Sequence, residues 1–89
     1  MKNKYDQELL RLLSEISTDK AMSEVLSNIL TPAEREELAI RLQIFKALEA
    51  GESQRSIAKR LEVSLATVSR GSRELKYGKP GVAKALKYD

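Results

Sequence analysis

The stretch Gln54–Lys76, QRSIAKRLEVSLATVSRGSRELK, carries the most specific pattern in this chain of 89 residues. Its first part predicts a short helix over 54–61, because Ile57, Ala58 and Leu61 fall on one helical face. A small residue such as Ala58 lets a second helix cross the first at close range. The spacing is therefore typical of a helix-turn-helix, although an ordinary pair of core helices in a small bundle has a similar pattern.

A three-residue turn, EVS, follows, and a second helix is expected from there to about Lys76. Ser64 ends the turn and is suited to cap this helix, because its side-chain oxygen can accept a hydrogen bond from an amide two or three residues later. We predict that Leu65, Val68 and Leu75 point inward. In a helix-turn-helix, the second helix enters the major groove of DNA.

The distribution of charge favours DNA over a purely structural role. Residues 1–52 carry seven Lys/Arg and ten Asp/Glu, a net charge of −3, whereas residues 53–79 carry seven basic and two acidic residues, a net charge of +5. Residues 80–89 add a further +1. A basic module beside an acidic scaffold is the pattern expected of a protein that binds a polyanion such as double-stranded DNA.

Composition argues against several other classes of protein. The chain has no Cys and no His, so the commonest nucleophiles, general bases and metal ligands are missing. We therefore predict that the protein is not an enzyme and that it has no catalytic residues and no metal site. Apolar runs are too short to span a membrane, and the N-terminus MKNKYDQE lacks the apolar core of a signal peptide. We expect a cytoplasmic protein with no membrane partner.

Three further helices are predicted before the helix pair: over 3–17, from a cap at Thr18 or Asp19 to about Leu30, and over 32–50. The apolar stripes of the first two are wider than a one-sided surface helix needs. A wide stripe suits a helix buried between two partners, so it favours an intertwined homodimer, with a monomeric bundle as the alternative. The first stripe comprises Tyr5, Leu9, Leu12, Leu13 and Ile16, widened by Leu10.

The third of these helices has the clearest local signals. Thr31 is expected to cap it, with Pro32 at the first helical position and Glu34 completing a capping box. Gly51 is expected to end it in a left-handed conformation. By default, Arg41 is a surface arginine that covers neighbouring apolar groups. The predicted stripe comprises Leu38, Leu42, Phe45 and Leu48, widened by Ala39, Ile40 and Ile44.

Gly71 lies inside the second helix of the pair, where glycine costs about 1 kcal/mol relative to alanine. Either a partner backbone that packs closely at this position or a ligand that approaches the helix would explain it. After Lys76, Val82–Leu86 is expected to add at most a short helix. We therefore predict an all-α fold forming one domain over 1–89. Its parts are a helical dimerisation core over 1–50, a DNA-reading head over 53–77, and a short tail or helix over 78–89.

The chain resembles the tryptophan repressor family over about residues 28–77. The resemblance rests on LTPAERE (Leu30–Glu36), on Arg41, and on GESQRSIAKRLEVSLATVSRGSRELK (Gly51–Lys76). It implies a sequence-specific DNA-binding transcriptional repressor, an intertwined homodimer with one helix-turn-helix per chain. The two heads would contact successive major grooves of a palindromic operator.

The resemblance also implies which residues contact DNA. Arg55 corresponds to an arginine that reaches a guanine edge. Gln54 and Lys76 correspond to residues that position the protein on the DNA backbone. The full set of DNA-binding candidates is Gln54, Arg55, Lys59, Ser64, Leu65, Ala66, Thr67, Ser69 and Lys76.

A co-repressor, L-tryptophan, is implied in the same way, bound between core and head. Arg41 and Arg70 correspond to two arginines that sandwich the indole ring, which replaces the default role of Arg41, and Arg70 would also pair with the ligand carboxylate. Gly71 corresponds to the place where the ligand lies against the helix. The ligand-binding candidates are Leu30 and Thr31, from the other subunit, and Arg41, Arg70, Gly71 and Glu74.

Two departures from the family bear on the ligand. Glu74 stands where the family has a serine that helps to hold the ligand's amino group. The connection before the helix-turn-helix is one residue shorter than in the best-known members. Two alternatives therefore stay open: a DNA-binding regulator of the same fold with a different ligand or none, and a helical module that binds another protein.

Overall fold

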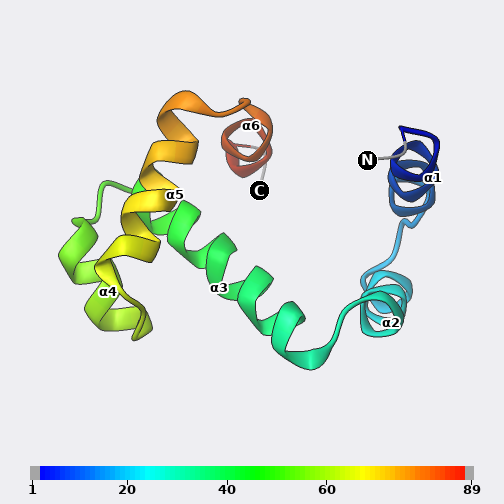
Figure 1. The fold of residues 1–89 in the computed structure, drawn as a ribbon, viewed down its shortest axis with the longest axis horizontal. Helices are drawn as coiled ribbons and strands as arrows, with labels where there is room; N and C mark the ends of the chain where they lie inside the picture. The colour runs from blue at the N-terminus through cyan, green and yellow to red at the C-terminus, as the bar shows by residue number, and fades with distance from the viewer. Residues whose placement is uncertain (1–2, 88–89) are drawn as a thin grey trace. The chain divides into compact units, whose positions relative to one another are not determined.

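The computed structural model describes residues 3–87, and all secondary structure in that range is helical. This confirms the predicted all-α fold. The chain divides into two compact units, Met1–Arg35 and Glu36–Asp89, which are described separately. The helices, coloured along the chain in Figure 1, are α1 (Asn3–Ser14), α2 (Asp19–Ile29), α3 (Pro32–Glu49), α4 (Gln54–Leu61), α5 (Leu65–Tyr77) and α6 (Gly81–Lys87).

The first helix is shorter than predicted, because α1 ends at Ser14 and not at residue 17. The Ser14 hydroxyl donates to the Arg11 carbonyl at 3.0 Å. Thr18 then adopts an extended conformation and its Oγ1 accepts from the Ala21 amide at 3.1 Å. Thr18, and not Asp19, is therefore the cap of α2, and the chain must leave α1 before it can form this cap.

The predicted capping box is present at the start of α3. The Glu34 amide donates to Thr31 Oγ1 at 3.1 Å, and the Thr31 amide donates to Glu34 Oε1 at 2.8 Å. Arg35, in the first turn of α3, reaches α2 with both terminal nitrogens of its guanidinium. Nη1 donates to the Ser23 carbonyl at 3.0 Å and to Ser27 Oγ at 2.7 Å, and Nη2 donates to Ser23 Oγ at 3.0 Å. These bonds hold α2 against the first turn of α3.

The buried core of the described residues lies in the C-terminal unit, where α3, α4 and α5 meet. Ile57 of α4 and Val68 of α5 are fully buried, and Ile44 and Ala47 of α3 complete the cluster. The predicted interior face of α4 is thus confirmed. Half-buried apolar residues surround this cluster, namely Ile40, Leu48, Ala58, Leu61 and Val63.

The wide apolar stripe of α3 is used on one side only. Ile44 and Ala47 are buried, whereas Leu38 and Leu42 are each 44% exposed. The N-terminal unit has still less interior, since α1 and α2 contain no buried residue. The large apolar residues exposed on these two helices are Tyr5, Leu9, Leu10, Leu12 and Ile29. Across residues 3–87, no helix combines the length and apolar character needed to cross a membrane.

Candidate nucleic-acid interface

Two serine caps and one left-handed residue shape the helix pair. Ser53 Oγ accepts from the Ser56 amide at 3.2 Å and so starts α4. Glu62 ends α4 at φ 56° and ψ 46°, and its amide donates to the carbonyls of Ala58 and Lys59. This left-handed residue reverses the chain within the predicted three-residue turn, and α5 then packs against α4. The arrangement is that of a helix-turn-helix.

The start of α5 displays small and apolar side chains to solvent. Ser64 Oγ accepts from the Thr67 amide at 3.1 Å and lies 2.8 Å from Thr67 Oγ1, which confirms Ser64 as the cap. Ala66 and Thr67 are exposed. Leu65 is 45% exposed, so the prediction that it points inward is wrong. Leu65 is the first residue of α5 and lies three residues before the buried Val68, so the buried face of α5 does not reach the start of the helix.

A side-chain hydrogen bond joins the start of α4 to α5. Ser69 Oγ donates to Gln54 Oε1 at 2.7 Å, and both side chains are half-buried. Because the carboxamide oxygen of Gln54 accepts this bond, its NH₂ group is turned away from Ser69 and can donate elsewhere. A phosphate oxygen is a suitable acceptor for it.

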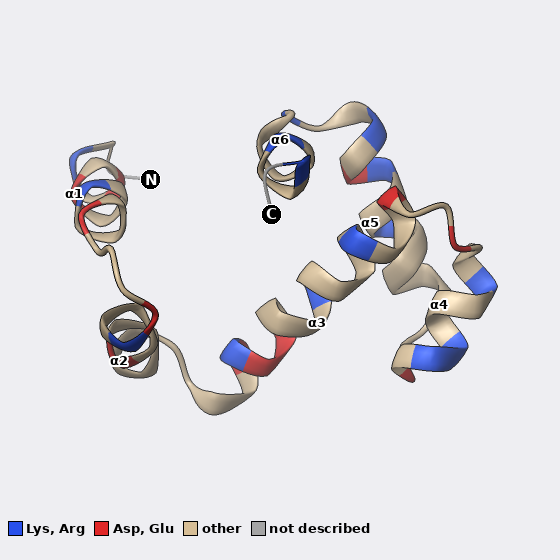
Figure 2. Ribbon diagram, turned by 180° about the vertical axis from the view of Figure 1, so that it is seen from behind, with Lys and Arg blue, Asp and Glu red and all other residues tan. Residues whose placement is uncertain are grey.

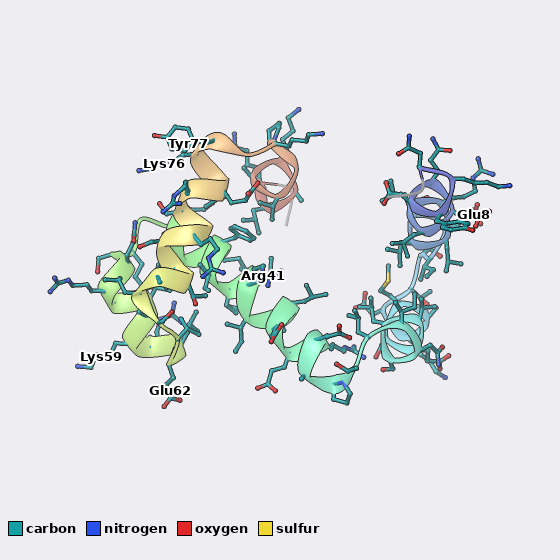
Figure 3. The ribbon with its side chains drawn as sticks, in the orientation of Figure 1. Glu8, Arg41, Lys59, Glu62, Lys76 and Tyr77 are labelled. Atoms are coloured by element: carbon teal, nitrogen blue, oxygen red, sulfur yellow. The ribbon has the colours of Figure 1, made fainter. Side chains whose placement is uncertain are left out.

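Basic side chains line the same two helices. Arg55 and Lys59 are exposed and lie one helical turn apart on α4, so they share a face. Lys76 is exposed at the far end of α5 from Glu62 (Figure 3). Lys and Arg outnumber Asp and Glu on both helices (Figure 2). All nine predicted DNA-binding residues therefore lie on α4, α5 and the turn between them, within one compact unit.

The structure adds an ion pair that the sequence reasoning missed. Arg60 Nη2 lies 2.7 Å from Glu52 Oε1, Arg60 Nε donates to Glu52 Oε2 at 3.2 Å, and Ser56 Oγ donates to the same oxygen at 2.7 Å. The hydrogen bonds from Arg60, and to a smaller extent the one from Ser56, lower the pKa of the Glu52 carboxyl. The sequence offers only a partial signal, because Ser56 and Arg60 are four residues apart and share a face of α4, whereas Glu52 lies before that helix begins.

The two arginines predicted to bind the ligand lie in the C-terminal unit. Arg41 projects from the middle of α3 (Figure 3), and Arg70 lies on α5. Both are exposed. Among residues 3–87, neither forms a hydrogen bond or an ion pair within the chain, so both guanidinium groups remain available to a ligand.

Glu74 contacts the residue that follows the end of its own helix, α5. Its carbonyl accepts from the Gly78 amide at 2.8 Å. Its carboxyl group covers Gly78 so closely that any side chain at that position would collide with it. The carboxyl therefore folds over the end of its own helix. A role for Glu74 in holding a ligand's amino group stays a prediction.

Gly71 marks a close approach of α5 to α3. A Cβ atom at this position would lie 3.0 Å from Ile44 Cγ2 and 3.6 Å from Leu48 Cδ1. The first distance is shorter than normal van der Waals contact, so an alanine would push against the core. Packing against α3 thus explains a glycine within α5, and the predicted ligand contact at Gly71 remains untested.

The last two ligand candidates belong to the N-terminal unit. The Leu30 amide donates to the Leu26 carbonyl at 2.8 Å and closes α2, and Thr31 forms the capping box of α3. Hydrogen bonds to the end of α2 and to the start of α3 therefore fix the local conformation of these two residues. No group of His, Cys, Asp or Glu within residues 3–87 has the arrangement of a metal site.

In a comparison with known proteins, residues 4–89 of this chain match the family described as "Trp repressor protein". Curated relatives carry the description "Trp operon repressor homolog". The relative from Vibrio campbellii is 39% identical over 71 residues, covering 79% of this chain and 71% of the relative. The relative from Chlamydia trachomatis serovar L2 is 38% identical over 84 residues, covering 90% of this chain and 89% of the relative. No solved structure gave a significant match.

Proposed function

The chain belongs to the Trp repressor protein family, and on that premise we propose that it is a homodimeric, operator-specific repressor controlled by L-tryptophan. Members of this family are regulatory DNA-binding proteins and not enzymes. The proposal therefore concerns three properties of this chain: which surface reads DNA, what completes the dimer, and how a ligand changes the affinity for DNA. A repressor of this kind acts where the DNA is, in the cytoplasm of a cell without a nucleus.

The observation that carries the DNA-binding role is the exposed first turn of α5 beside the basic face of α4. Ala66 and Thr67 are small enough to let the backbone of α5 approach base edges, and the Thr67 methyl group can contact a thymine methyl. Arg55 and Lys59 are exposed on the adjacent helix. Arg55 would pair with a guanine, and Gln54, Lys59 and Lys76 would contact the sugar–phosphate backbone.

The open apolar faces support the homodimer. Helices α1 and α2 bury none of their residues, and Leu38 and Leu42 leave a second face of α3 unused. A second copy of the chain that covered these faces would remove apolar surface from water, and this would stabilise the dimer by about 25 cal/mol per Å² of apolar surface buried. A dimer also supplies two heads for the two halves of a palindromic operator.

The ligand role is supported by the two available guanidinium groups, Arg41 on α3 and Arg70 on α5. An aromatic ring stacks well on guanidinium planes, and a carboxylate pairs with the guanidinium fork. The ligand would link α3 to the head and so set the angle at which α5 meets DNA. It increases DNA affinity only if it binds the DNA-competent conformation better than the alternatives.

Arg55→Ala tests the DNA-binding part of the proposal. Loss of a bidentate base contact should weaken specific binding by about 1–3 kcal/mol and relax the preference at one base pair. The probe is the duplex that the wild-type protein selects from a random-sequence pool. Lys20→Ala on α2 is the matched control, since it removes a positive charge outside the helix pair. Equal affinities for Arg55→Ala and wild type would exclude Arg55 from the base contacts, whereas failure of the wild-type protein to select any duplex would favour a protein partner over DNA.

Calorimetry with L-tryptophan tests the co-repressor separately. We expect heat of binding for the wild-type protein, a large loss of affinity in Arg70→Ala, and tighter binding of the selected duplex when L-tryptophan is present. No heat at millimolar L-tryptophan, together with unchanged duplex binding, would remove the co-repressor while leaving the DNA-binding role intact. Repeating the duplex assay with other amino acids distinguishes a different ligand from none.

A further inference from the structure

Glu52, in the short connection between α3 and α4, is hydrogen-bonded to both helices. Gly51 has φ +89°, and its amide donates to the Leu48 carbonyl at 3.0 Å. The Glu52 amide donates to the Ala47 carbonyl, also at 3.0 Å. These paired bonds form the Schellman motif that closes a helix. The main chain of Glu52 is therefore fixed to the end of α3.

The side chain of Glu52 is fixed to α4 instead. One carboxylate oxygen, Oε1, accepts from Arg60 Nη2 at 2.7 Å. The other, Oε2, accepts from Arg60 Nε at 3.2 Å and from Ser56 Oγ at 2.7 Å. Arg60 lies in the last turn of α4 and Ser56 in the first, so the carboxylate is bonded along the helix. We call Glu52, Ser56 and Arg60 the elbow clip.

We propose that the elbow clip positions the reading head: Glu52 and Arg60 hold α4 at a fixed orientation to α3 and thereby favour the DNA-binding geometry. This inference rests on the proposed DNA-binding function. The bidentate pairing supports it, because two parallel hydrogen bonds restrict orientation as well as distance. Arg60 is then a positioning residue and not a phosphate contact, although it is one of three basic residues on α4.

If charge alone governed DNA affinity, removing the charge of Glu52 would change that affinity in the direction opposite to the one expected from the elbow clip. Glu52→Gln raises the net charge by one, so a protein attracted to DNA only by charge would bind more tightly. If the elbow clip positions the head, the same change weakens binding. Arg60 offers a second distinction. Removal of a phosphate contact lowers the slope of log affinity against log salt by about 0.9, whereas removal of a positioning bond leaves that slope unchanged.

The test measures binding of wild type, Glu52→Gln, Arg60→Gln and the double variant to the duplex selected by the wild-type protein, over a range of salt concentrations. We expect each single variant to bind about threefold more weakly, as for a well-oriented exposed ion pair. The double variant should bind no more weakly than either single variant. Glu62→Gln, which removes an acidic residue from the same head outside the clip, is the control and should not weaken binding. Tighter binding by Glu52→Gln, or additive losses, would overturn the proposal.

Two further measurements are needed. One separates the effect of the geometry of the elbow clip from the effect of its charge, and the other tests the clip in the absence of DNA. Arg60→Lys keeps the charge but loses the fork, so it should weaken binding almost as much as Arg60→Gln, whereas a phosphate contact would tolerate it. Amide hydrogen exchange along α4 without DNA should be faster in Glu52→Gln than in wild type. If the wild-type protein selects no duplex, the proposed function fails, and the exchange data still decide whether the clip holds α4.

Discussion

The two units of this chain have similar amphipathic sequences but close their interiors differently. In the C-terminal unit, single residues from α4 and α5 are fully buried against α3, and three helices complete a core with their own side chains. In the N-terminal unit, α1 and α2 have broad apolar stripes and bury none of them. An apolar stripe therefore shows which face of a helix needs a partner, but not whether the same chain supplies it.

Removing a core side chain of the C-terminal unit should have the largest effect. Ile57→Ala leaves a cavity among α3, α4 and α5 and should lower the free energy of unfolding by about 3 kcal/mol. Urea unfolding followed by far-UV circular dichroism, at one fixed protein concentration, measures the change. Leu65→Ala is the matched control. Because Leu65 is 45% exposed, its truncation should cost less than about 1 kcal/mol. Equal losses at the two positions would contradict a core closed by the unit itself.

A charge on the open face of α1 should act on assembly instead. Leu12 is 48% exposed, and Leu12→Asp should weaken a homodimer by about 2 kcal/mol or more, through lost apolar contact and the cost of covering a carboxylate. Sedimentation equilibrium should show the mass falling from a dimer towards a single chain of 10.0 kDa. Gln7→Asp adds the same charge to the same helix at a polar position and should leave the mass unchanged. An unaffected dimer in Leu12→Asp would exclude this part of α1 from the interface.

The left-handed turn of the reading head offers a smaller, stabilising change. Glu62 has φ 56°, a conformation in which a side chain costs roughly 1 kcal/mol and glycine costs little. Glu62→Gly should therefore raise the free energy of unfolding by about 0.5–1 kcal/mol. Glu62→Ala is the control, because it removes the carboxyl but keeps the strained backbone. Stabilisation by both substitutions would point to the carboxyl group and not to the conformation.

The smallest expected effect is the pH dependence of the elbow clip. Hydrogen bonds from Arg60 and Ser56 lower the pKa of Glu52 from its usual 4.5. A carboxyl whose pKa is lower in the folded state stabilises that state above the unfolded pKa, and this contribution is lost as the pH falls through the folded pKa. The melting temperature of wild type should exceed that of Glu52→Gln near neutral pH, with a gap that closes below about pH 4.5. A gap independent of pH would show that the charge of Glu52 is irrelevant.

Local signals were read correctly from the sequence because a few neighbouring residues determine them. Thr31 with Glu34, and Ser64, each satisfy amides within one helical turn, and Gly51 adopts the positive φ expected of it. Helix ends of this kind depend on no distant contact. The positions of the candidate DNA-binding residues on α4 and α5 follow from the same local boundaries.

Features that depend on which helices meet were not predictable in the same way. The apolar residues of α3 extend around much of the helix, and only the docking of α4 and α5 selects Ile44 and Ala47 for burial while leaving Leu38 and Leu42 exposed. Two explanations were predicted for Gly71, a close partner backbone and a ligand, and the structure shows instead a close side chain, that of Ile44. The end of α1 at Ser14 reflects competition with the Thr18 cap, which a stripe of leucines does not reveal.

The hydrogen bond between Ser69 and Gln54 has a consequence for the kinetics of operator recognition. A serine hydroxyl has one proton, and in this structure that proton is directed to the Gln54 carboxamide. Phosphates offer only acceptors, so Ser69 can donate to DNA only after releasing Gln54. A bond exchanged in this way adds little net affinity and inserts a side-chain rotation between encounter and the final complex. Ser69→Ala would therefore change the rates of association and dissociation more than their ratio.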